Sequence, residues 1–405
     1  MVIVLALVAL AVLAAVAGLH WYVWRRLVRD TTRGPGPARR AGTALFVAGP
    51  LLMTAALVSE RTGAPFPLQR ALAWPGFLWM ALALYLLLGV VAGEAARPLL
   101  RRALRYRDRP RPRSRQAAGP PAPTAAPAAQ DPARRLVVAR AVGAVAATAA
   151  VATVGHGTYG VLRGPRVKRV TVPLAKLPRA AHGFRIAVVS DIHLGPVLGR
   201  GFAQRVVDTV NATRPDLIAV VGDLVDGSVE DLGPAAAPLA RLRARHGAYF
   251  VTGNHEYFSG AEQWVEEVRE LGLHPLRNAR TELPFFDLAG VDDVQGESEG
   301  QGPDFGKALG GRDRARACVL LAHQPVQIHE SVRYGVDLQL SGHTHGGQLW
   351  PGSLLAAAAN PTVAGLDRYG DTQLYVSRGA GAWGPPTRVG APSDVTVIEL
   401  AATRA

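Results

Sequence analysis

The sequence predicts an α/β domain that follows an α-helical membrane region. Long uncharged apolar runs are confined to the first 162 residues, whereas short apolar runs alternate with amphipathic helical ones from about Val170 onward. The charge divides at the same place. Residues 1–169 hold 24 Lys and Arg against 5 Asp and Glu, which leaves 21 basic and 26 acidic residues in the remainder. A uniformly basic nucleic-acid-binding protein would not divide its charge in this way.

Four apolar segments of the N-terminal part are predicted to cross a membrane. The first, residues 2–23, is followed rather than preceded by basic residues, which favours a retained span over a cleaved signal peptide. The others are residues 44–58, 72–92 and 136–162, and the alternative for the last is a packed helix of the folded domain. The expected organisation is a membrane region with three transmembrane helices over 1–106, an Arg/Pro/Ala-rich linker over 107–134, a fourth transmembrane helix over 135–162 and a folded domain over 168–401.

Loop charge predicts the orientation of these spans. The loops after the first and third spans are rich in Arg, whereas the loop after the second span contains only Arg61 and Arg70. Because basic loops remain in the cytoplasm, we expect a multi-pass cell-membrane protein whose C-terminal folded domain is extracytoplasmic. Basic residues at 163–169 oppose this orientation unless they contact anionic headgroups.

Five short apolar runs of the C-terminal part end in side chains that can bind metal ions. The runs are residues 186–190, 217–221, 249–252, 319–322 and 338–340, and helical periodicity is expected over 202–213 and 261–271. The side chains that follow the five runs are Asp191 and His193, Asp223 and Asp226, Asn254, His255 and Glu256, His323, and His343 and His345. Functional sites of α/β folds gather at the carboxyl ends of strands, so we expect these side chains to meet.

The residue types indicate a divalent-metal site of a hydrolase. Carboxylates, imidazoles and an amide bind hard-to-borderline divalent ions. The single cysteine, Cys318, lies in an apolar run and is expected to be a buried thiol, so a cysteine-based zinc or iron–sulfur site is excluded. The sequence has neither a G-x-S-x-G element nor a phosphate-binding P-loop. Two ions that share a carboxylate lower the pKa of a bridging water and suit hydrolysis at phosphorus.

The ordered blocks D-x-H, G-D-x-x-D, G-N-H-E, H and G-H-x-H resemble the metallophosphoesterase family, also called calcineurin-like phosphoesterases. The resemblance covers roughly residues 183–400. The extension of the last block to Gly346-Gly347-Gln348 and the tail Ser377-Arg378-Gly379-Ala380-Gly381 are similar to a bacterial membrane-associated branch of that family. The resemblance implies a four-layer α/β/β/α sandwich.

The resemblance also implies a role for each site residue. It assigns the first metal ion to Asp191, His193 and His345, the second to Asn254, His323 and His343, and a bridging position to Asp223. His255 would protonate the leaving oxygen, and Asp226 would orient His255. Glu256 remains open between a solvated position and a helix cap. The cofactors implied are two divalent ions of Mn, Fe or Zn, among which these residue types do not distinguish.

The expected function is hydrolysis of a phosphate ester, phosphodiester or pyrophosphate bond at a membrane surface. Residues 349–356 and 285–286 are apolar and expected to be loops. They either lie against lipid, which favours a lipid-linked substrate, or pack into the domain. Arg378 and Arg388 either bind substrate phosphate or are surface charges. The alternatives are a nuclease of the same family, which the acidic domain disfavours, and a non-catalytic membrane sensor or scaffold, which would not need His255.

Overall fold

The computed structural model describes residues 2–107 and 132–403, which form two compact units. The first unit is Met1–Ala55 with Trp79–Val154, and the second is Ala56–Leu78 with Gly155–Ala405. The linker expected over 107–134 lies outside the described residues, except at the two ends where the flanking helices stop and start.

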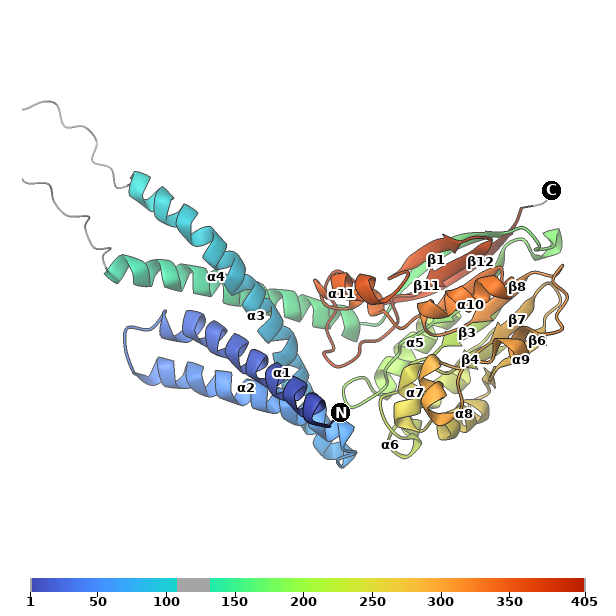
Figure 1. Cartoon of the computed structure of the whole chain (residues 1–405), viewed down its shortest axis with the longest axis horizontal. Helices are drawn as coiled ribbons and strands as arrows, with labels where there is room; N and C mark the ends of the chain where they lie inside the picture. The colour runs from blue at the N-terminus through green and yellow to red at the C-terminus, as the bar shows by residue number, and fades with distance from the viewer. Residues whose placement is uncertain (1, 108–131, 404–405) are drawn as a thin grey trace, which may run out of the picture. The chain divides into compact units, whose positions relative to one another are not determined.

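The N-terminal part is built from long helices (Figure 1). They are α1 (Val2–Trp24), extended by a π-helical turn at Arg25–Arg29, α2 (Pro37–Arg61), α3 (Phe66–Arg107) and α4 (Pro132–Leu162). Three helical segments of the described chain are long and apolar enough to cross a membrane, namely Pro37–Arg61, Phe66–Leu99 and Arg135–Leu162. The helix α1 covers the first expected span. The helix α2 extends beyond the expected span at both ends and contains Pro50 in its interior.

The second unit contains two six-stranded sheets. The first has the order β1-β12-β2-β3-β4-β5, with β1 (Arg166–Leu174), β2 (Phe184–Val189), β3 (Leu217–Val221), β4 (Ala248–Val251), β5 (His274–Pro275) and β12 (Asp394–Ala402). The second has the order β10-β11-β9-β8-β7-β6, with β6 (Ala279–Glu282), β7 (Asp287–Gly290), β8 (Cys318–Leu321), β9 (Leu338–Ser341), β10 (Gly365–Tyr369) and β11 (Thr372–Val376). The neighbours β2, β3 and β4 are parallel, as are β7, β8 and β9. Their carboxyl ends therefore lie at one edge of each sheet.

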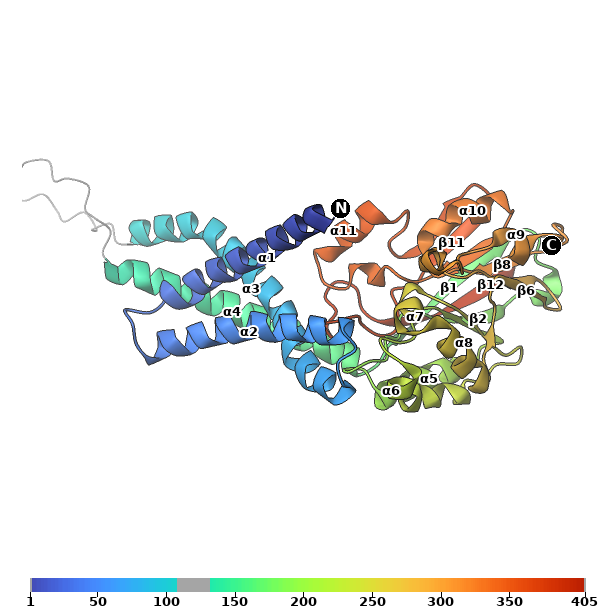
Figure 2. The ribbon, with the colours of Figure 1, turned by 60° about the horizontal axis from the view of Figure 1, so that its bottom comes forward.

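Helices cover the outer face of each sheet, so the domain has four layers (Figure 2). The first sheet is covered by α5 (Arg200–Ala212), α6 (Val229–Ala236) and α8 (Ala261–Glu270), and the second by α9 (Phe305–Leu309) and α10 (Ile328–Arg333). The helices α7 (Asn254–Ser259) and α11 (Gly352–Ala359) follow β4 and β9. Short 3-10 turns occupy Arg179–Ala181, Ala237–Arg241, Val294–Glu299, Pro325–Gln327 and His345–Gly347. The sandwich implied by the family resemblance is confirmed.

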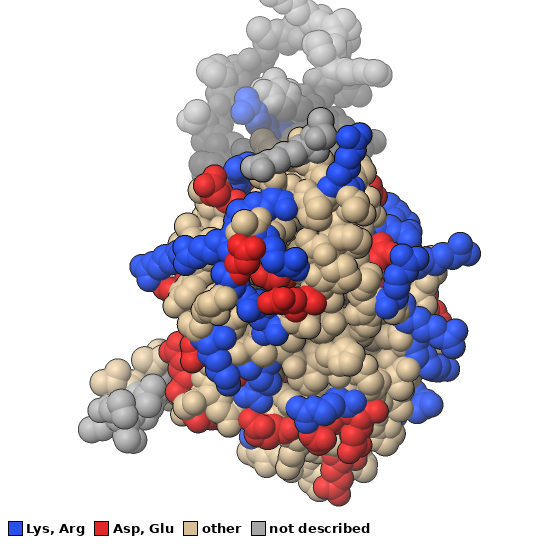
Figure 3. Space-filling model, turned by 90° about the vertical axis from the view of Figure 1, so that its right-hand side faces the viewer, with Lys and Arg blue, Asp and Glu red and all other residues tan. Residues whose placement is uncertain are grey.

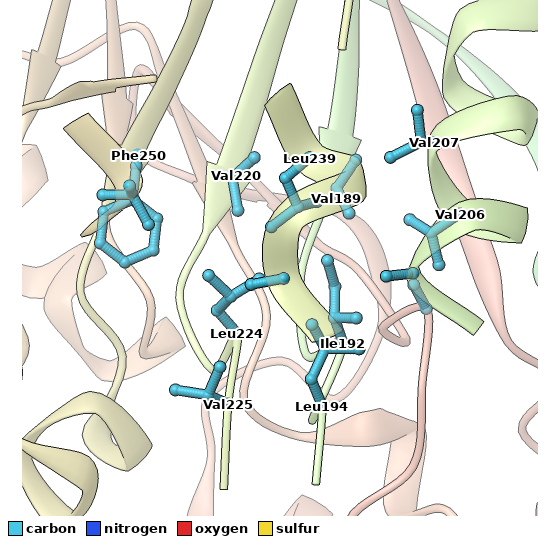
Figure 4. Packing of buried hydrophobic residues seen from close by; sticks show 14 of the residues in the cluster. Val189, Ile192, Leu194, Val206, Val207, Val220, Leu224, Val225, Leu239 and Phe250 are labelled. Carbon is cyan, nitrogen blue, oxygen red and sulfur yellow. The ribbon is translucent and has the colours of Figure 1, made fainter. Parts of the chain in front are cut away.

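Alternation along β2 shows why the first sheet is buried on both faces. Ile186 and Val188 join the apolar cluster between the two sheets, whereas Ala187 and Val189 join the cluster beneath the helices. Helix α5 contributes Val206 and Val207 to that second cluster, where they lie with residues of β2, β3 and β4 (Figure 4). Burying each such side chain contributes about 1.5–3 kcal/mol, so this packing holds the three strand ends in fixed positions.

The structure decides one open alternative about the apolar segments and corrects one expectation. Phe286 is fully buried and Phe285 partly buried in the cluster between the sheets, where Phe286 packs edge-on against Phe184 with ring centroids 5.2 Å apart. They are therefore core residues of the β6–β7 hairpin and do not face lipid. Residues 352–359 form the helix α11 rather than a loop, and none of its residues is buried.

Candidate metal centre

The loops that follow five strands from both sheets bring ligand-type side chains together. Three groups lie close enough for one metal-binding atom of each member to be within 4.8 Å of the others. The groups are Asp191, His193 and His345; His193, Asp226 and His255; and Asp223, His323 and His343. The first and third groups take side chains from both sheets, so the centre depends on the way the sandwich packs.

The first group places two imidazoles and a carboxylate around one point. Nε2 of His193 lies 3.0 Å from Nε2 of His345, and the latter atom lies 3.4 Å from Oδ1 of Asp191. Nδ1 of His193 lies 2.9 Å from Oδ1 of Asp226. Because a carboxylate accepts this hydrogen bond, the proton of His193 resides on Nδ1 and the lone pair of Nε2 faces the centre.

The third group has the same construction, and Asn254, the first residue of α7, lies beside its two imidazoles. Oδ1 of Asn254 lies 3.2 Å from Nε2 of His323 and 2.9 Å from Nδ1 of His343. Nδ1 of His323 donates to the main-chain oxygen of Val221, 2.9 Å away. The Nε2 lone pair of His323 is consequently directed at the amide oxygen and at the carboxylate of Asp223.

Asp223 lies between the first group and the two imidazoles of the third group. Its Oδ2 is 3.2 Å from Nε2 of His323 and 3.7 Å from Nε2 of His193, and its Oδ1 accepts a hydrogen bond of 2.9 Å from the main-chain N–H of His255. The side chain is buried. One of its oxygens is thus held by the backbone while the other faces both groups.

This donor set fits divalent cations. Imidazole nitrogens and carboxylate or amide oxygens face one another across the focus at 3.0–3.7 Å. Such an arrangement of buried lone pairs is stabilised by positive charge at its focus. Oxygen and imidazole ligands of this kind suit Mn, Fe and Zn alike.

Burial and mutual charge shift the pKa of several groups at the focus. Burial alone would raise the pKa of Asp223, but the charge of His323, its hydrogen bond and the charges of the neighbouring histidines together outweigh burial and hold that pKa well below the usual range. His323 is affected reciprocally, because Asp223 raises its pKa well above normal despite burial. Burial and the neighbouring His193 and Arg388 lower the pKa of His345 well below normal, which keeps its imidazole neutral.

His255 belongs to the second group, which lies beside the other two, and it shares Asp226 with His193. Its Nδ1 is 2.7 Å from Oδ1 of Asp226. Burial opposes the charged imidazole, but the hydrogen bond to Asp226 and the charges of the nearby carboxylates together outweigh it and raise the pKa of His255 to about 9. The two histidines together lower the pKa of Asp226 to about 2 against the effect of burial. Among the described residues Nε2 of His255 has no hydrogen-bond partner, so it is available to a bound molecule.

The backbone is left-handed at five of the converging residues. The φ angles are 52° at Asp191, 49° at His193, 52° at Asp223, 72° at His343 and 52° at His345. A non-glycine residue in this region costs of order 1–3 kcal/mol unless its surroundings impose it. The strain turns each chain sharply after its strand, and this aims the side chains back across the sheet edge.

Two glycines allow these loops to approach one another. A Cβ atom on Gly253 would lie 2.3 Å from Oδ1 of Asp223, and one on Gly342 would lie 1.8 Å from Oγ of Ser190. Side-chain atoms cannot occupy such positions without displacing the carboxylate or the strand end. The glycines of the G-N-H-E and G-H-x-H blocks therefore serve close packing of the centre.

Two residues beside the centre had no single role assigned from the sequence. Glu256 is fully buried and accepts hydrogen bonds from the main-chain N–H groups of Gly253 (2.6 Å), Leu224 (2.7 Å) and Asp223 (2.9 Å). The helix-cap alternative is therefore correct and the solvated one is wrong. The spacing of Glu256 from the α7 N-cap was the available signal.

Arg388 is neither a surface charge nor an exposed phosphate ligand. It is buried, it donates to the main-chain oxygens of Gly381 (2.6 Å), His345 (3.0 Å) and Ala391 (3.2 Å), and its Nη2 lies 3.1 Å from Nδ1 of His345. It thus holds the loop of the last ligand motif from behind. No local sequence pattern marks such a residue.

All nine site residues expected from the sequence lie in this centre, whereas their individual roles remain predictions. They are Asp191, His193, Asp223, Asp226, Asn254, His255, His323, His343 and His345.

Comparison with known proteins finds a family match over the part of the chain that contains the metal centre. Residues 184–347 match the profile of the calcineurin-like phosphoesterases. A Danio rerio protein named "Transmembrane protein with metallophosphoesterase domain" is 40% identical over 259 residues, which cover 60% of this chain and 59% of that protein. An uncharacterized metallophosphoesterase of Aquifex aeolicus is 35% identical over 58% of this chain and 91% of its own length. The metallophosphoesterase YkuE of Bacillus subtilis is 30% identical over 64% of this chain and 95% of its own length.

The profile match contains both ends of the centre, from Asp191 to His345. The two bacterial relatives are covered almost completely, whereas the chain spans 59% of the length of the Danio rerio relative. With the four-layer fold and the convergent ligands, these matches show that the chain belongs to the calcineurin-like phosphoesterase family.

Proposed function

We propose that this protein is a membrane-anchored, metal-dependent phosphoesterase that hydrolyses a phosphate ester, phosphodiester or pyrophosphate bond. The observation that carries the proposal is the convergence of His193, His345 and His323 on carboxylate and amide oxygens, with the Nδ1 atoms of His193 and His323 already engaged by acceptors. A non-catalytic scaffold would not require imidazole lone pairs to be aimed at a common focus.

The centre has room in its donor set for two cations. Asp191, His193 and His345 would hold the first, Asn254, His323 and His343 would hold the second, and Asp223 would contact both. When bound, such a pair supplies Lewis-acid activation of water and neutralises charge at phosphorus. The chain itself supplies the fixed positions of these ligands, through the strand-end turns and the hydrogen bonds to Asp226 and Val221.

His255 is the proposed proton donor to the leaving oxygen. Its Nδ1 is held by Asp226 at 2.7 Å, which leaves Nε2 directed away from that carboxylate and toward the partly exposed side of the centre. Trp383 and Phe258 flank the ring, each with a centroid 5.6 Å away, and restrict its movement. A positioned imidazole of this kind contributes about 10²–10⁴-fold in rate as a general acid.

The protein is proposed to be multi-pass with an extracytoplasmic catalytic domain. Residues 56–78 comprise the end of α2, the loop that follows it and the start of α3, and they belong to the same compact unit as the α/β domain. Within that unit, Phe66 packs on the core of the domain. The loop after the second span and the end of the fourth would then lie on one side, as an even number of crossings between them requires. The Arg-rich loops would lie on the other side, in agreement with the charge rule.

A lipid-linked phosphate, phosphodiester or pyrophosphate is the proposed substrate class. The spans hold the centre near a bilayer, where an amphiphilic substrate is concentrated. A nuclease would need a continuous basic surface. On the face drawn in Figure 3, by contrast, basic and acidic side chains both occur across the surface.

The decisive experiment is Asp223→Asn in the detergent-solubilised full-length protein. Wild type stripped of metal and resupplied with Mn²⁺, Fe²⁺ or Zn²⁺ is expected to hydrolyse bis(4-nitrophenyl) phosphate. The variant should lose this activity, because an amide cannot bridge two cations as a carboxylate does. Metal-dependent turnover at the wild-type rate in Asp223→Asn would refute the mechanism. A substrate panel of soluble nucleotides against phospholipids and lipid-linked diphosphates then tests the substrate class.

A further inference from the structure

An exposed apolar surface lies directly after the last ligand motif. Trp350 is 54% exposed, Leu354 is 69% exposed and Leu355 is 77% exposed, and the helix α11 that carries the two leucines buries none of its residues. No charged residue occurs from Gly346 to Leu366. Soluble surfaces rarely leave large aliphatic side chains this exposed in an uncharged stretch, so the surface requires an occupant.

A second loop joins this surface. Nε2 of Gln348 donates to the main-chain oxygens of Trp383 (2.8 Å) and Pro385 (3.1 Å), and its Oε1 accepts from the main-chain N–H of Trp383 (3.1 Å). The side chain of Trp383 is 46% exposed. We call Trp350, Leu354, Leu355 and Trp383 the apolar rim; its two loops are fastened to each other by Gln348.

The apolar rim is continuous with the end of a membrane-spanning helix. Oγ1 of Thr387, in the Trp383 loop, lies 2.7 Å from Oγ1 of Thr158 in α4, and the main-chain N–H of Arg388 donates to the oxygen of Gly157. Helix α4 continues to Leu162. At a rise of 1.5 Å per residue, Thr158 lies about 6 Å before the end of that apolar helix. The rim loop is therefore anchored at a depth that falls within the span rather than beyond it.

We infer that the apolar rim is a membrane-docking surface whose occupant is the outer part of the bilayer leaflet from which α4 emerges. Amphipathic elements of this type bury about 5–10 Å into the boundary between headgroups and acyl chains, which matches the depth set by Thr158. Tryptophan favours that boundary because its ring is apolar and its N–H is polar.

Docking of the rim would place the metal centre at headgroup level. Trp383 lies against His255 with ring centroids 5.6 Å apart, and Gln348 follows His345 by three residues. Phe258, on the other side of His255, packs beneath the guanidinium of Arg61 at the end of α2, 5.5 Å from the ring centroid. A phosphate carried by a lipid would reach His255 without leaving the membrane; this consequence alone rests on the proposed function.

The test places a reporter on the rim of the full-length protein. Cys318 is the single cysteine and is buried, so Leu355→Cys provides one accessible thiol for an environment-sensitive fluorophore. Val332→Cys on α10, where the native side chain is 40% exposed, is the matched control. In vesicles of phosphatidylcholine and phosphatidylglycerol, spin-labelled lipid should quench the label at 355 and not the label at 332, whereas aqueous iodide should do the reverse. Equal iodide quenching at both positions would overturn the docking surface.

An activity measurement separates this inference from the proposed function. Leu355→Glu should lower hydrolysis of vesicle-embedded phosphatidic acid or lipid diphosphate by at least about tenfold, because it places a charge where the leucine is inferred to enter the bilayer. It should leave hydrolysis of soluble bis(4-nitrophenyl) phosphate unchanged, as should Val332→Glu for both substrates. If wild type hydrolyses neither substrate, the proposed function fails, whereas the quenching result still decides the docking surface.

Discussion

Arg388 holds the main chain of the last ligand motif although it lies 43 positions beyond His345. Its guanidinium satisfies the buried oxygens of Gly381, His345 and Ala391. Burial lowers its pKa to about 10, so it still carries a full charge at neutral pH. The charge is balanced by carboxylates of the domain rather than by solvent.

Removing this side chain should destabilise the domain. Arg388→Ala leaves buried acceptors unpaired, at about 1–3 kcal/mol for each. We expect the melting temperature of the detergent-solubilised protein to fall by several degrees. The control is Arg333→Ala, which breaks an exposed ion pair with Glu330 and should change the melting temperature little. Equal effects of the two variants would contradict the structural role of Arg388.

The reactivity of the Cys318 thiol reports whether strand β8 is buried. It is fully buried in β8, and burial raises the pKa of its thiol to about 12. At pH 8 the thiolate fraction is then about 10⁻⁴, so the folded protein should not react with a maleimide on the hour scale. Unfolding in denaturant should expose the thiol and give complete labelling, as measured by mass spectrometry. Rapid labelling of the folded protein would show that β8 is not packed as described.

At the scale of elements, the start of α7 offers a matched pair of glycines. Gly253 and Gly199 are both N-cap residues with a φ of −104°, at the starts of α7 and α5. A Cβ on Gly253 would lie 2.3 Å from the Asp223 carboxylate, whereas one on Gly199 would meet no atom within 4 Å.

Gly253→Ala should therefore displace Asp223 and reduce activity by about a hundredfold. Gly199→Ala should lower the free energy of unfolding by about 0.5–1 kcal/mol and leave activity intact, because the N-cap preference alone is affected. Rates measured on bis(4-nitrophenyl) phosphate compare the two variants directly. Similar losses in both would mean that N-cap geometry, rather than contact with Asp223, sets the requirement.

The strands and the site were predictable from the sequence because both follow local rules. Apolar runs that end in Asp, His or Asn place ligands at strand ends, and parallel strands bring those ends to one edge. The state of residues 285–286 was not predictable in the same way. Phe285 and Phe286 are adjacent in sequence, and whether two such rings face lipid or the core depends on the opposite sheet, which no local pattern encodes.

Two further features, the helix α11 and the burial of Arg388, could not be predicted from the sequence. The uncharged residues 349–356 contain Pro351 and Gly352 and therefore resembled a loop, although Pro and Gly at a helix start do not prevent the helix that follows. Arg388 forms its contacts with loops that are distant in sequence, so its type and neighbours gave no indication of burial. In both cases tertiary packing decided between alternatives that the sequence left open.

At the scale of the whole molecule, orientation in the membrane can be tested independently of chemistry. Alkaline phosphatase is active only outside the cytoplasm of a bacterial host. A fusion after Pro173, beyond the fourth span, should be active, and a fusion in the Arg-rich loop after the first span should be inactive. The reverse pattern would place the catalytic domain in the cytoplasm and would leave the metal chemistry unaffected.

Five residues of the metal centre trade stability for function in their left-handed backbone conformation. They are Asp191, His193, Asp223, His343 and His345. Glycine would relieve each of these turns at little conformational cost, yet it would delete the side chain that the turn presents. A laboratory library sorted for heat tolerance alone, with no assay of turnover, should therefore accumulate glycine at these five positions. The selected variants would be more stable to heat than the parent protein and would have no catalytic activity.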